Sequence, residues 1–270
     1  MADVKWSVKG KVILVTGGAA GIGAGLVRGL LTQNASHVAF LDILEREGES
    51  LEGELLNNFG ALKAKFIKCD VSNDEQLTRA YQQVIDKYKR LDAVINNAAV
   101  IGVADGIHQK TVDVNLTATI NSTLKALELM SVDNGGGGGI VINVSSVEAL
   151  QHKSPPVYSA TKLAVLQFST QIAASNEEKY ANTGVRIITV CLGPTDTALL
   201  HRHNYIKEKN VAMEISNRQR VTSAVAGIIG VINSGSNGST WIIAGDKPPA
   251  DATGDVREAF QIISKATNFV

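Results

Sequence analysis

Short apolar runs alternate along this chain with longer stretches in which apolar residues recur every three or four positions. The short runs have the length of strands buried on both faces, and the longer stretches have the period of helices with one apolar side. The predicted strands are Val12–Val15, Val38–Leu41, Lys65–Ile67, Ala93–Ile95, Ile140–Val144, Val185–Val190 and Thr240–Ile243. The predicted helices are Ile22–Leu31, Arg46–Asn58, Asp74–Tyr88, Gln109–Met130, Tyr158–Tyr180 and Val221–Ile232.

This order of elements predicts an α/β fold. Right-handed crossovers between parallel strands place the connecting helices on both faces of the sheet. We therefore expect a Rossmann-like, doubly wound parallel sheet of about seven strands with helices on both faces. The sequence has no internal repeat and no change of composition that would mark a boundary, so residues 1–270 are expected to form a single domain.

Composition narrows the classes of protein that the chain can represent. Its 270 residues are 44% hydrophobic, enough for a large core. Lys and Arg (26) balance Asp and Glu (26), so no overall positive field attracts nucleic acid or anionic lipid. No apolar run approaches the ~20 residues of a membrane span, and the first ten residues lack the apolar core of a signal peptide. We expect a cytoplasmic protein.

The cysteines and histidines give little sign of a disulfide or a metal. The only two cysteines, Cys69 and Cys191, lie in apolar strand-like runs and are expected to be reduced, buried thiols. The five histidines form no cluster with the ligand spacing that zinc requires, so no metal site is predicted.

The segment Thr16–Gly23, Thr-Gly-Gly-Ala-Ala-Gly-Ile-Gly, follows the first strand and opens the first helix. Its glycines would allow a sharp turn, close approach of backbone amides to a pyrophosphate, and tight packing of the helix on the sheet. A glycine turn with a purely structural role is the alternative, but the position between strand and helix is the one that dinucleotide binding requires. The predicted coenzyme contacts here are Gly17, Gly21, Ile22 and Gly23.

Acidic residues follow the second and third strands. Asp42 lies 19 residues after Gly23, where a carboxylate accepts hydrogen bonds from the adenosine ribose and repels a 2′-phosphate. This favours NAD over NADP. Asp70 and Val71 are expected at the adenine edge, although Asp70 also fits a turn or helix-capping role.

Tyr158 and Lys162 are separated by one helical turn and so share a helix face. A neighbouring cation favours the phenolate and lowers the tyrosine pKa, which makes the phenol a proton acceptor near neutral pH. The pair alone is a weak signal, because this spacing also occurs on solvated helices.

Five motifs in order resemble the short-chain dehydrogenase/reductase family, from about Lys11 to Trp241. They are Thr16–Gly23, Asn96-Asn97-Ala98-Ala99, Asn115, Ser145-Ser146 and Tyr158-x-x-x-Lys162. Three further stretches look most like the insect alcohol dehydrogenases of the fruit-fly type and the related 15-hydroxyprostaglandin dehydrogenases. These stretches are Val114–Thr117, Pro156–Lys162 and Asn237–Trp241.

The resemblance implies a role for each catalytic residue. Tyr158 would be the general acid/base, and Ser146 would hold and polarise the substrate oxygen. Lys162 would lower the tyrosine pKa and bind the nicotinamide ribose. Asn115 would support a water molecule that links Lys162 to solvent. This chemistry needs no metal.

The resemblance also implies further coenzyme contacts. Asn97 and Ala98 stand where the family has Asn-Asn-Ala-Gly. Leu192–Thr197 resembles the family's Pro-Gly-x-x-x-Thr segment, so Gly193 with Thr195 or Thr197 would hold the nicotinamide carboxamide.

The catalytic serine has two candidates. Counting from the strand selects Ser146, whereas counting back 13 residues from the tyrosine, the family's usual separation, selects Ser145. We choose Ser146, because strand geometry sets which side chain faces the cleft and loops absorb deletions more easily.

These observations predict an NAD-dependent oxidoreductase that interconverts a hydrophobic, secondary alcohol and its ketone or aldehyde. The substrate region is placed at about 195–220, with Leu199, Leu200, Tyr205, Ile206, Val211 and Met213 as its apolar residues. The alternatives are an NADP-dependent carbonyl reductase and a catalytically silent nucleotide-binding protein. By resemblance, the helices Gln109–Met130 and Tyr158–Tyr180 would form a homodimer or homotetramer.

Overall fold

The computed structural model describes residues 6–101, 108–151, 155–175, 183–202 and 218–266. In these ranges, eight strands form one sheet in the order β3-β2-β1-β4-β5-β6-β7-β8. All neighbouring pairs are parallel except β7 and β8, which are antiparallel. The strands are β1 Val12–Thr16, β2 His37–Asp42, β3 Ala64–Lys68, β4 Ala93–Asn96, β5 Gly139–Ser146, β6 Val185–Leu192, β7 Thr240–Ile243 and β8 Ala250–Asp251.

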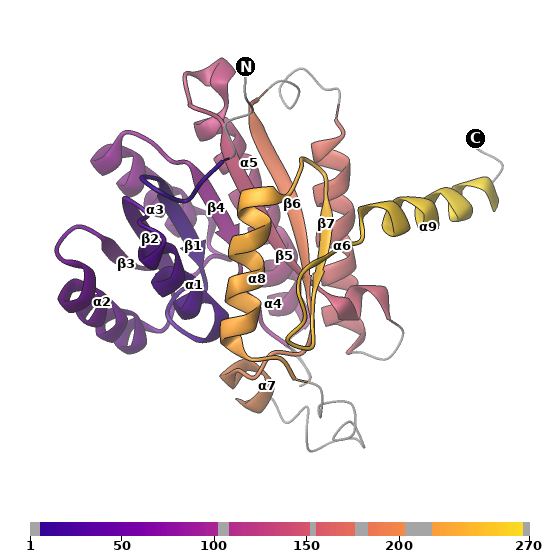
Figure 1. Ribbon diagram of the computed structural model, residues 1–270, viewed down its shortest axis with the longest axis horizontal. Helices are drawn as coiled ribbons and strands as arrows, with labels where there is room; N and C mark the ends of the chain where they lie inside the picture. Colours follow the sequence, from indigo (N-terminus) through magenta and orange to yellow (C-terminus); the bar gives the residue numbers. More distant parts are fainter. Residues whose placement is uncertain (1–5, 102–107, 152–154, 176–182, 203–217, 267–270) are drawn as a thin grey trace.

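Helices cover both faces of this sheet (Figure 1). On one face, apolar residues of α1 Gly21–Thr32, α2 Glu45–Phe59 and α8 Val221–Ser234 pack into one core cluster with the strands. On the other face, α3 Asp74–Tyr88, α5 Ala118–Met130 and α6 Pro156–Ala173 contribute to a second cluster. The predicted doubly wound α/β sheet is therefore confirmed, and the seven expected strands are β1–β7.

The shorter helical segments connect these layers. They are α4 His108–Val112, the π-helical turn Asp113–Thr117, the 3₁₀ turns Val132–Asn134 and Val147–Leu150, and α7 Ala198–Arg202.

The predicted helix Gln109–Met130 is confirmed, because the chain is helical without interruption from His108 to Met130, with a wide π-helical turn between α4 and α5. The turn contains Asn115, whose buried carboxamide accepts a hydrogen bond from the Val100 amide (2.8 Å) and donates one to the Val100 carbonyl (3.0 Å). Single π-helical turns inside α-helices are frequent at functional sites.

The predicted helix Tyr158–Tyr180 is wrong at both ends. Helix α6 begins two residues earlier, at Pro156, and ends at Ala173. Proline suits a first helical turn, since its missing N–H has no partner there in any case.

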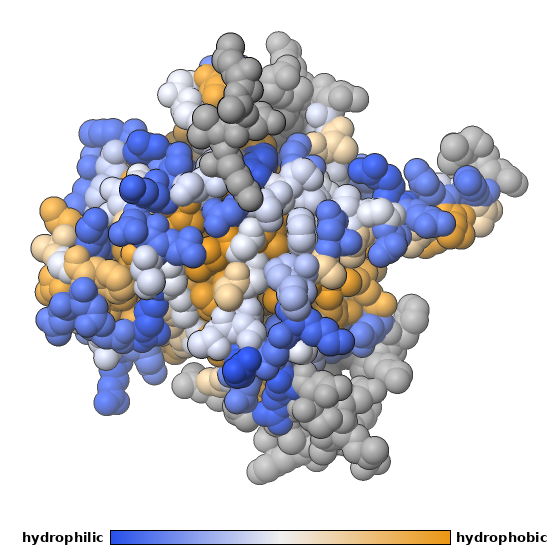
Figure 2. All heavy atoms as spheres, viewed as in Figure 1, coloured by the Kyte–Doolittle hydropathy of each residue, from blue (hydrophilic) through white to orange (hydrophobic). Residues whose placement is uncertain are grey.

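The elements after β7 were not predicted. Strand β8 extends the sheet, and α9 Thr253–Ala266 projects from the body of the protein (Figure 1). Figure 2 shows hydrophobic side chains along one side of this helix, where Phe260, Ile262 and Ile263 are exposed.

Neither membrane segments nor metal-ligand clusters stand out in the described ranges. No helix there has both the length and the apolar character needed to cross a bilayer. No three His, Cys, Asp or Glu side chains in the same ranges are grouped closely enough to hold a metal ion. Cys69 and Cys191 are buried free thiols, as the sequence predicted.

Candidate active site

A cavity of about 520 Å³ lies at the carboxyl ends of the parallel strands. It extends from the turn after β1, past the point where the strand order reverses between β1 and β4, to the ends of β5 and β6. Such a switch point is where open α/β sheets bind ligands. The predicted site residues that line it are Gly17, Gly21, Ile22, Asp42, Asp70, Val71, Asn97, Ala98, Ser146, Tyr158, Lys162, Gly193 and Thr195.

The turn after β1 is shaped by glycines that other residues cannot replace. Gly17 has φ +65°, and a Cβ there would lie 2.8 Å from Ala98 Cα. A Cβ at Gly23 would lie 1.9 Å from the Gly17 carbonyl oxygen. Gly23 does not line the cavity. Because it has no side chain, α1 packs directly against the turn.

The start of α1 offers backbone donors to the cavity. The helix follows Ala20, which cannot cap it with a side chain, and Ala20, Gly21 and Ile22 line the cavity. The first N–H groups of a helix have no intrahelical partner and attract anions. This end of the cavity therefore fits a pyrophosphate.

Asp42 joins the end of β2 to this turn. One carboxylate oxygen accepts a hydrogen bond from the Ala19 amide (3.0 Å), and the other accepts one from the Leu44 amide (3.1 Å). A carboxylate oxygen has two lone pairs. Asp42 can thus hold the turn and still accept hydrogen bonds from ribose hydroxyls.

Asp70 is held by neighbours on two elements. One of its oxygens accepts hydrogen bonds from the backbone and side chain of Ser72 (3.0 and 2.7 Å), and the other accepts one from Lys110 Nζ (2.7 Å). Burial raises the pKa of Asp70, but the hydrogen bonds from Lys110 and Ser72 outweigh burial and lower it overall. Asp70 thus stays an ionised acceptor beside Val71 at one end of the cavity.

Asn97 fixes the turn rather than reaching freely into the cavity. Its side-chain amide donates to the carbonyls of Thr16 (3.0 Å) and Gly17 (3.1 Å). The backbone amides of Asn97 and Ala98 both donate to the Thr16 hydroxyl at 3.0 Å.

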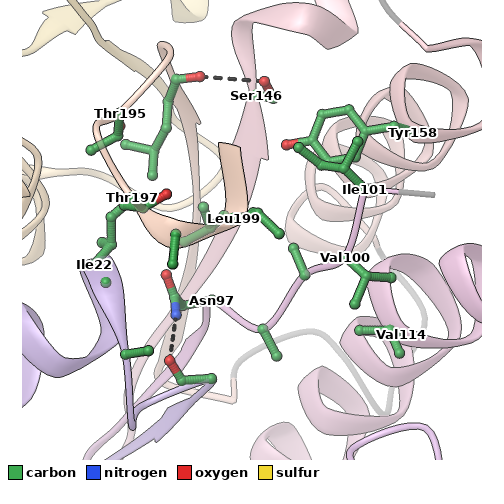
Figure 3. Close-up of a pocket in the computed structure, with 18 of the residues that line it drawn as sticks. Ile22, Asn97, Val100, Ile101, Val114, Ser146, Tyr158, Thr195, Thr197 and Leu199 are labelled. Atoms are coloured by element: carbon green, nitrogen blue, oxygen red, sulfur yellow. Dashed lines mark hydrogen bonds between the residues drawn. The ribbon is translucent and has the colours of Figure 1, made fainter. Parts of the chain in front are cut away.

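Both candidate serines are buried and line the cavity, but their hydroxyls have different partners. Ser145 is buried, and its hydroxyl donates to the Lys162 carbonyl at 2.7 Å. The Ser146 hydroxyl accepts from the Glu148 amide (3.2 Å) and makes a long contact with the Leu192 carbonyl (3.4 Å). Figure 3 shows the Tyr158 hydroxyl turned toward Ser146. This arrangement favours the sequence-based choice of Ser146.

Lys162 is almost completely buried, with 2% of its surface exposed. Its Nζ donates to the Val144 carbonyl (2.8 Å) and lies 5.9 Å from the centre of the Tyr158 ring. Burial lowers the pKa of Lys162 to about 8. The ammonium group of Lys162 therefore lies next to Tyr158, and its removal from water makes its charged form less favourable in the folded protein.

Asn115 lies behind the cavity wall and does not line it. Its side chain is fully buried, and besides its two bonds to Val100 it donates to the Thr161 hydroxyl at 3.2 Å. The structure thus places Asn115 against the residue that precedes Lys162.

The segment after β6 forms another wall. Gly193, Thr195 and Thr197 line the cavity. The Thr195 hydroxyl donates to the Gly193 carbonyl (2.9 Å) and accepts from Gln219 Nε2 (3.0 Å). Thr197 is oriented toward the interior in Figure 3.

The predicted substrate region is only partly visible. Leu199 and Leu200 line the cavity, together with Val100, Ile101 and Val114. Tyr205, Ile206, Val211 and Met213 lie outside the described residues.

Comparison with known proteins assigns the family. The family model for short chain dehydrogenases matches residues 11–207. The chain belongs to the short-chain dehydrogenase family. Human 15-hydroxyprostaglandin dehydrogenase [NAD(+)] is 36% identical over 219 residues, which cover 81% of this chain and 80% of that protein. Alcohol dehydrogenase 2 of Ceratitis cosyra is 30% identical over 242 residues, covering 87% of this chain and 92% of the relative.

A solved structure agrees on the fold. The crystal structure of levodione reductase superimposes with a TM-score of 0.76 at 20% identity, covering 88% of this chain and 97% of that one. At this identity the likeness supports the short-chain dehydrogenase fold and nothing finer.

Two side chains at this short-chain dehydrogenase site were missed by sequence reasoning. Lys110 reaches Asp70 across 40 residues of sequence, and Gln219 reaches Thr195 across 24. Neither belongs to a motif with a fixed spacing, so only the folded arrangement identifies them.

Proposed function

We propose that this short-chain dehydrogenase uses NAD to interconvert a hydrophobic secondary alcohol and its ketone or aldehyde, with Tyr158 as general acid/base. One observation carries the proposal. Tyr158, Ser146 and Lys162 line the same cavity as the glycine turn and Asp42. A proton acceptor and a coenzyme site in one cavity are what alcohol oxidation requires.

Tyr158, Lys162 and Ser146 have separate roles in the proton transfer. Tyr158 accepts the hydroxyl proton during oxidation and returns it during reduction. The Lys162 ammonium favours the phenolate through its charge, and Ser146 donates a hydrogen bond to the substrate oxygen. When bound, NAD supplies the acceptor for the hydride that leaves the alcohol carbon. Asn115 would act indirectly, by supporting a water molecule behind Lys162.

The coenzyme preference rests on Asp42. Its carboxylate lies in the cavity next to the start of α1 and is held there by Ala19 and Leu44. A negative charge at this place accepts ribose hydroxyls and repels a 2′-phosphate. The name of the human relative, 15-hydroxyprostaglandin dehydrogenase [NAD(+)], agrees with this choice.

The apolar lining supports a hydrophobic substrate. Val100, Ile101, Leu199 and Leu200 line the cavity, and Figure 3 shows Ile101 beside Tyr158. Apolar walls with few polar groups select ligands by shape and by burial of hydrocarbon.

The assembly and location form part of the same proposal. We expect a single catalytic domain over residues 1–270, acting in the cytoplasm as a homodimer or homotetramer through α5 and α6. Light scattering at micromolar concentration tests the assembly, and a monomer would contradict it.

The decisive experiment measures NAD reduction at 340 nm over a panel of aliphatic, terpenoid and steroid alcohols. Tyr158→Phe is expected to lose at least about a hundredfold in turnover, since it removes the general base, and to keep binding NADH. Tyr88→Phe is the matched control, because the buried Tyr88 hydroxyl has no hydrogen-bond partner within the described part of the chain and does not line the cavity. Full activity in Tyr158→Phe, or no activity of the unchanged protein with any alcohol despite tight NADH binding, would refute the proposal.

A further inference from the structure

Gln219 lies between the ends of β6 and β7 with none of its surface exposed. Its Nε2 donates to the Thr195 hydroxyl and to the Ile243 carbonyl, both at 3.0 Å, and makes a longer contact with the Gly193 carbonyl (3.4 Å). Its backbone amide donates to the Pro194 carbonyl (2.9 Å), and its carbonyl accepts from the Asp196 amide (3.0 Å). A buried side chain thus connects the segment after β6 to the end of the neighbouring strand.

We propose that Gln219 is a positioning residue for the nicotinamide end of the coenzyme site and acts through Thr195. The inference rests on the proposed function, in which Gly193–Thr197 holds the nicotinamide carboxamide. Gln219 itself does not line the cavity, whereas Gly193 and Thr195 do.

The hydrogen bonds of Thr195 define what it can offer a ligand. A threonine hydroxyl has one proton and two lone pairs. The proton is directed to the Gly193 carbonyl (2.9 Å), and Gln219 Nε2 occupies one lone pair. Thr195 is left as an acceptor. Its remaining lone pair matches the NH₂ group of a carboxamide and not the carboxamide oxygen.

The orientation of the Gln219 amide is fixed by its surroundings. The Ile243 carbonyl can only accept, so the atom 3.0 Å from it must be the NH₂ nitrogen. The same NH₂ group then has its second proton for Thr195. Gln219 therefore determines the direction of the Thr195 hydroxyl, and glutamate at this position could not.

The strand ends do not depend on the Gln219 side chain. The Gly193 amide donates to the Ile243 carbonyl at 2.8 Å, and the backbone bonds of Gln219 to Pro194 and Asp196 are independent of its side chain. Gln219→Met, which has similar length and no polar group, therefore tests the carboxamide while leaving the backbone connections in place.

The test compares the affinities of three ligands by calorimetry. ADP-ribose lacks the nicotinamide ring, NADH carries the carboxamide, and the reduced 3-acetylpyridine analogue has a methyl group in place of the NH₂. Gln219→Met is expected to weaken NADH about tenfold, the equivalent of about 1.4 kcal/mol, and to leave ADP-ribose within twofold. The acetylpyridine analogue should lose less than NADH, because it cannot donate to Thr195.

Three further variants separate positioning from general damage. Thr195→Val should weaken NADH binding similarly, and the double variant should bind no more weakly than Thr195→Val alone, since both changes remove the hydrogen bond between Gln219 and Thr195. Asn233→Leu, near the C-terminal end of α8, should change none of the three affinities; like Gln219 Oε1, the buried Asn233 Oδ1 has no hydrogen-bond partner among the described residues.

The outcomes are distinct. Unchanged NADH affinity in Gln219→Met, an equal loss for ADP-ribose, or additive effects of the two substitutions would each overturn the positioning role. If the unchanged protein binds neither NADH nor ADP-ribose, the proposed function itself fails.

Discussion

Replacing Lys162 with methionine should make the protein more stable at neutral pH while it abolishes activity. The lysine is buried, and burial lowers its pKa from the usual 10.5 to about 8. At about 1.36 kcal/mol for each tenfold change in proton affinity, keeping this ammonium charged in the folded state costs about 3 kcal/mol. Loss of the hydrogen bond to the Val144 carbonyl offsets about 1 kcal/mol of the gain. The expected net stabilisation is about 2 kcal/mol, or roughly 4 °C in Tm for a chain of this size.

The gain should depend on pH in a defined direction. Below pH about 8, Lys162 is protonated in both the folded and the unfolded chain, so the full cost is present. Between pH 8 and 10.5 the folded protein releases the proton first, and the cost falls as pH rises. The advantage of Lys162→Met should therefore be largest at pH 7 and should disappear by about pH 10.

Urea unfolding followed by circular dichroism at pH 7 and pH 10 measures this difference. Lys68→Met is the matched control. Its side chain is 61% exposed and paired with the exposed Glu45, so removing it should change the free energy of unfolding by less than about 0.5 kcal/mol. A Lys162→Met protein that is less stable than the unchanged one at pH 7, or a difference that stays constant up to pH 10, would refute the reasoning.

Four further substitutions test the remaining site assignments. Asp42→Ala should reduce the preference for NAD over NADP, measured as the ratio of kcat/KM values, at least tenfold, since it removes the repelling charge; an unchanged ratio would exclude Asp42 as the selector. Ser146→Ala should lower kcat about a hundredfold, whereas Ser145→Ala should cost about 1 kcal/mol of stability and little turnover; the reverse pattern would make Ser145 the catalytic serine. Lys110→Met should weaken NADH binding two- to fivefold in a fluorescence titration, because Asp70 loses its ion pair with Lys110. This is about the contribution of a half-exposed ion pair. Equal affinities would show that the pair is purely structural.

The alternation of apolar runs was enough to predict the seven strands and the helices between them. Strands buried on both faces must be continuously apolar, which makes runs such as Ile140–Val144 easy to identify. The π-helical turn within Gln109–Met130 was not predicted in this way, because helical periodicity continues on both sides of it. The bonds between Asn115 in this turn and Val100 form only when the chain is folded.

The C-terminal elements escaped prediction for a different reason. Strand β8 has only two residues, too few for any period to be recognised. Helix α9 does carry apolar residues at helical spacing, Val256, Phe260 and Ile263, but it has no buried residue. Its pattern was overlooked because the prediction followed elements that pack onto the sheet.

The residues of the candidate site differ in the same way in how far the sequence predicts them. Residues in local motifs, such as the glycine turn and the Tyr158–Lys162 pair, could be placed because the spacing carries the chemistry. Lys110 and Gln219 could not, because each meets the site through hydrogen bonds to residues far away in the sequence.

The π-helical turn decides how this stretch tolerates a change of length. Such a turn is a regular helix with one residue inserted, and its wider winding takes up the extra residue. Deleting one residue of Asp113–Thr117 other than Asn115 would therefore restore α-helical winding and keep Ser122, which is bonded to Tyr81, on the inward face of α5. Deleting a residue from the regular part of α5 would instead rotate everything beyond it by about 100°. Shortening inside the turn should therefore be far less damaging than the same shortening one or two turns later.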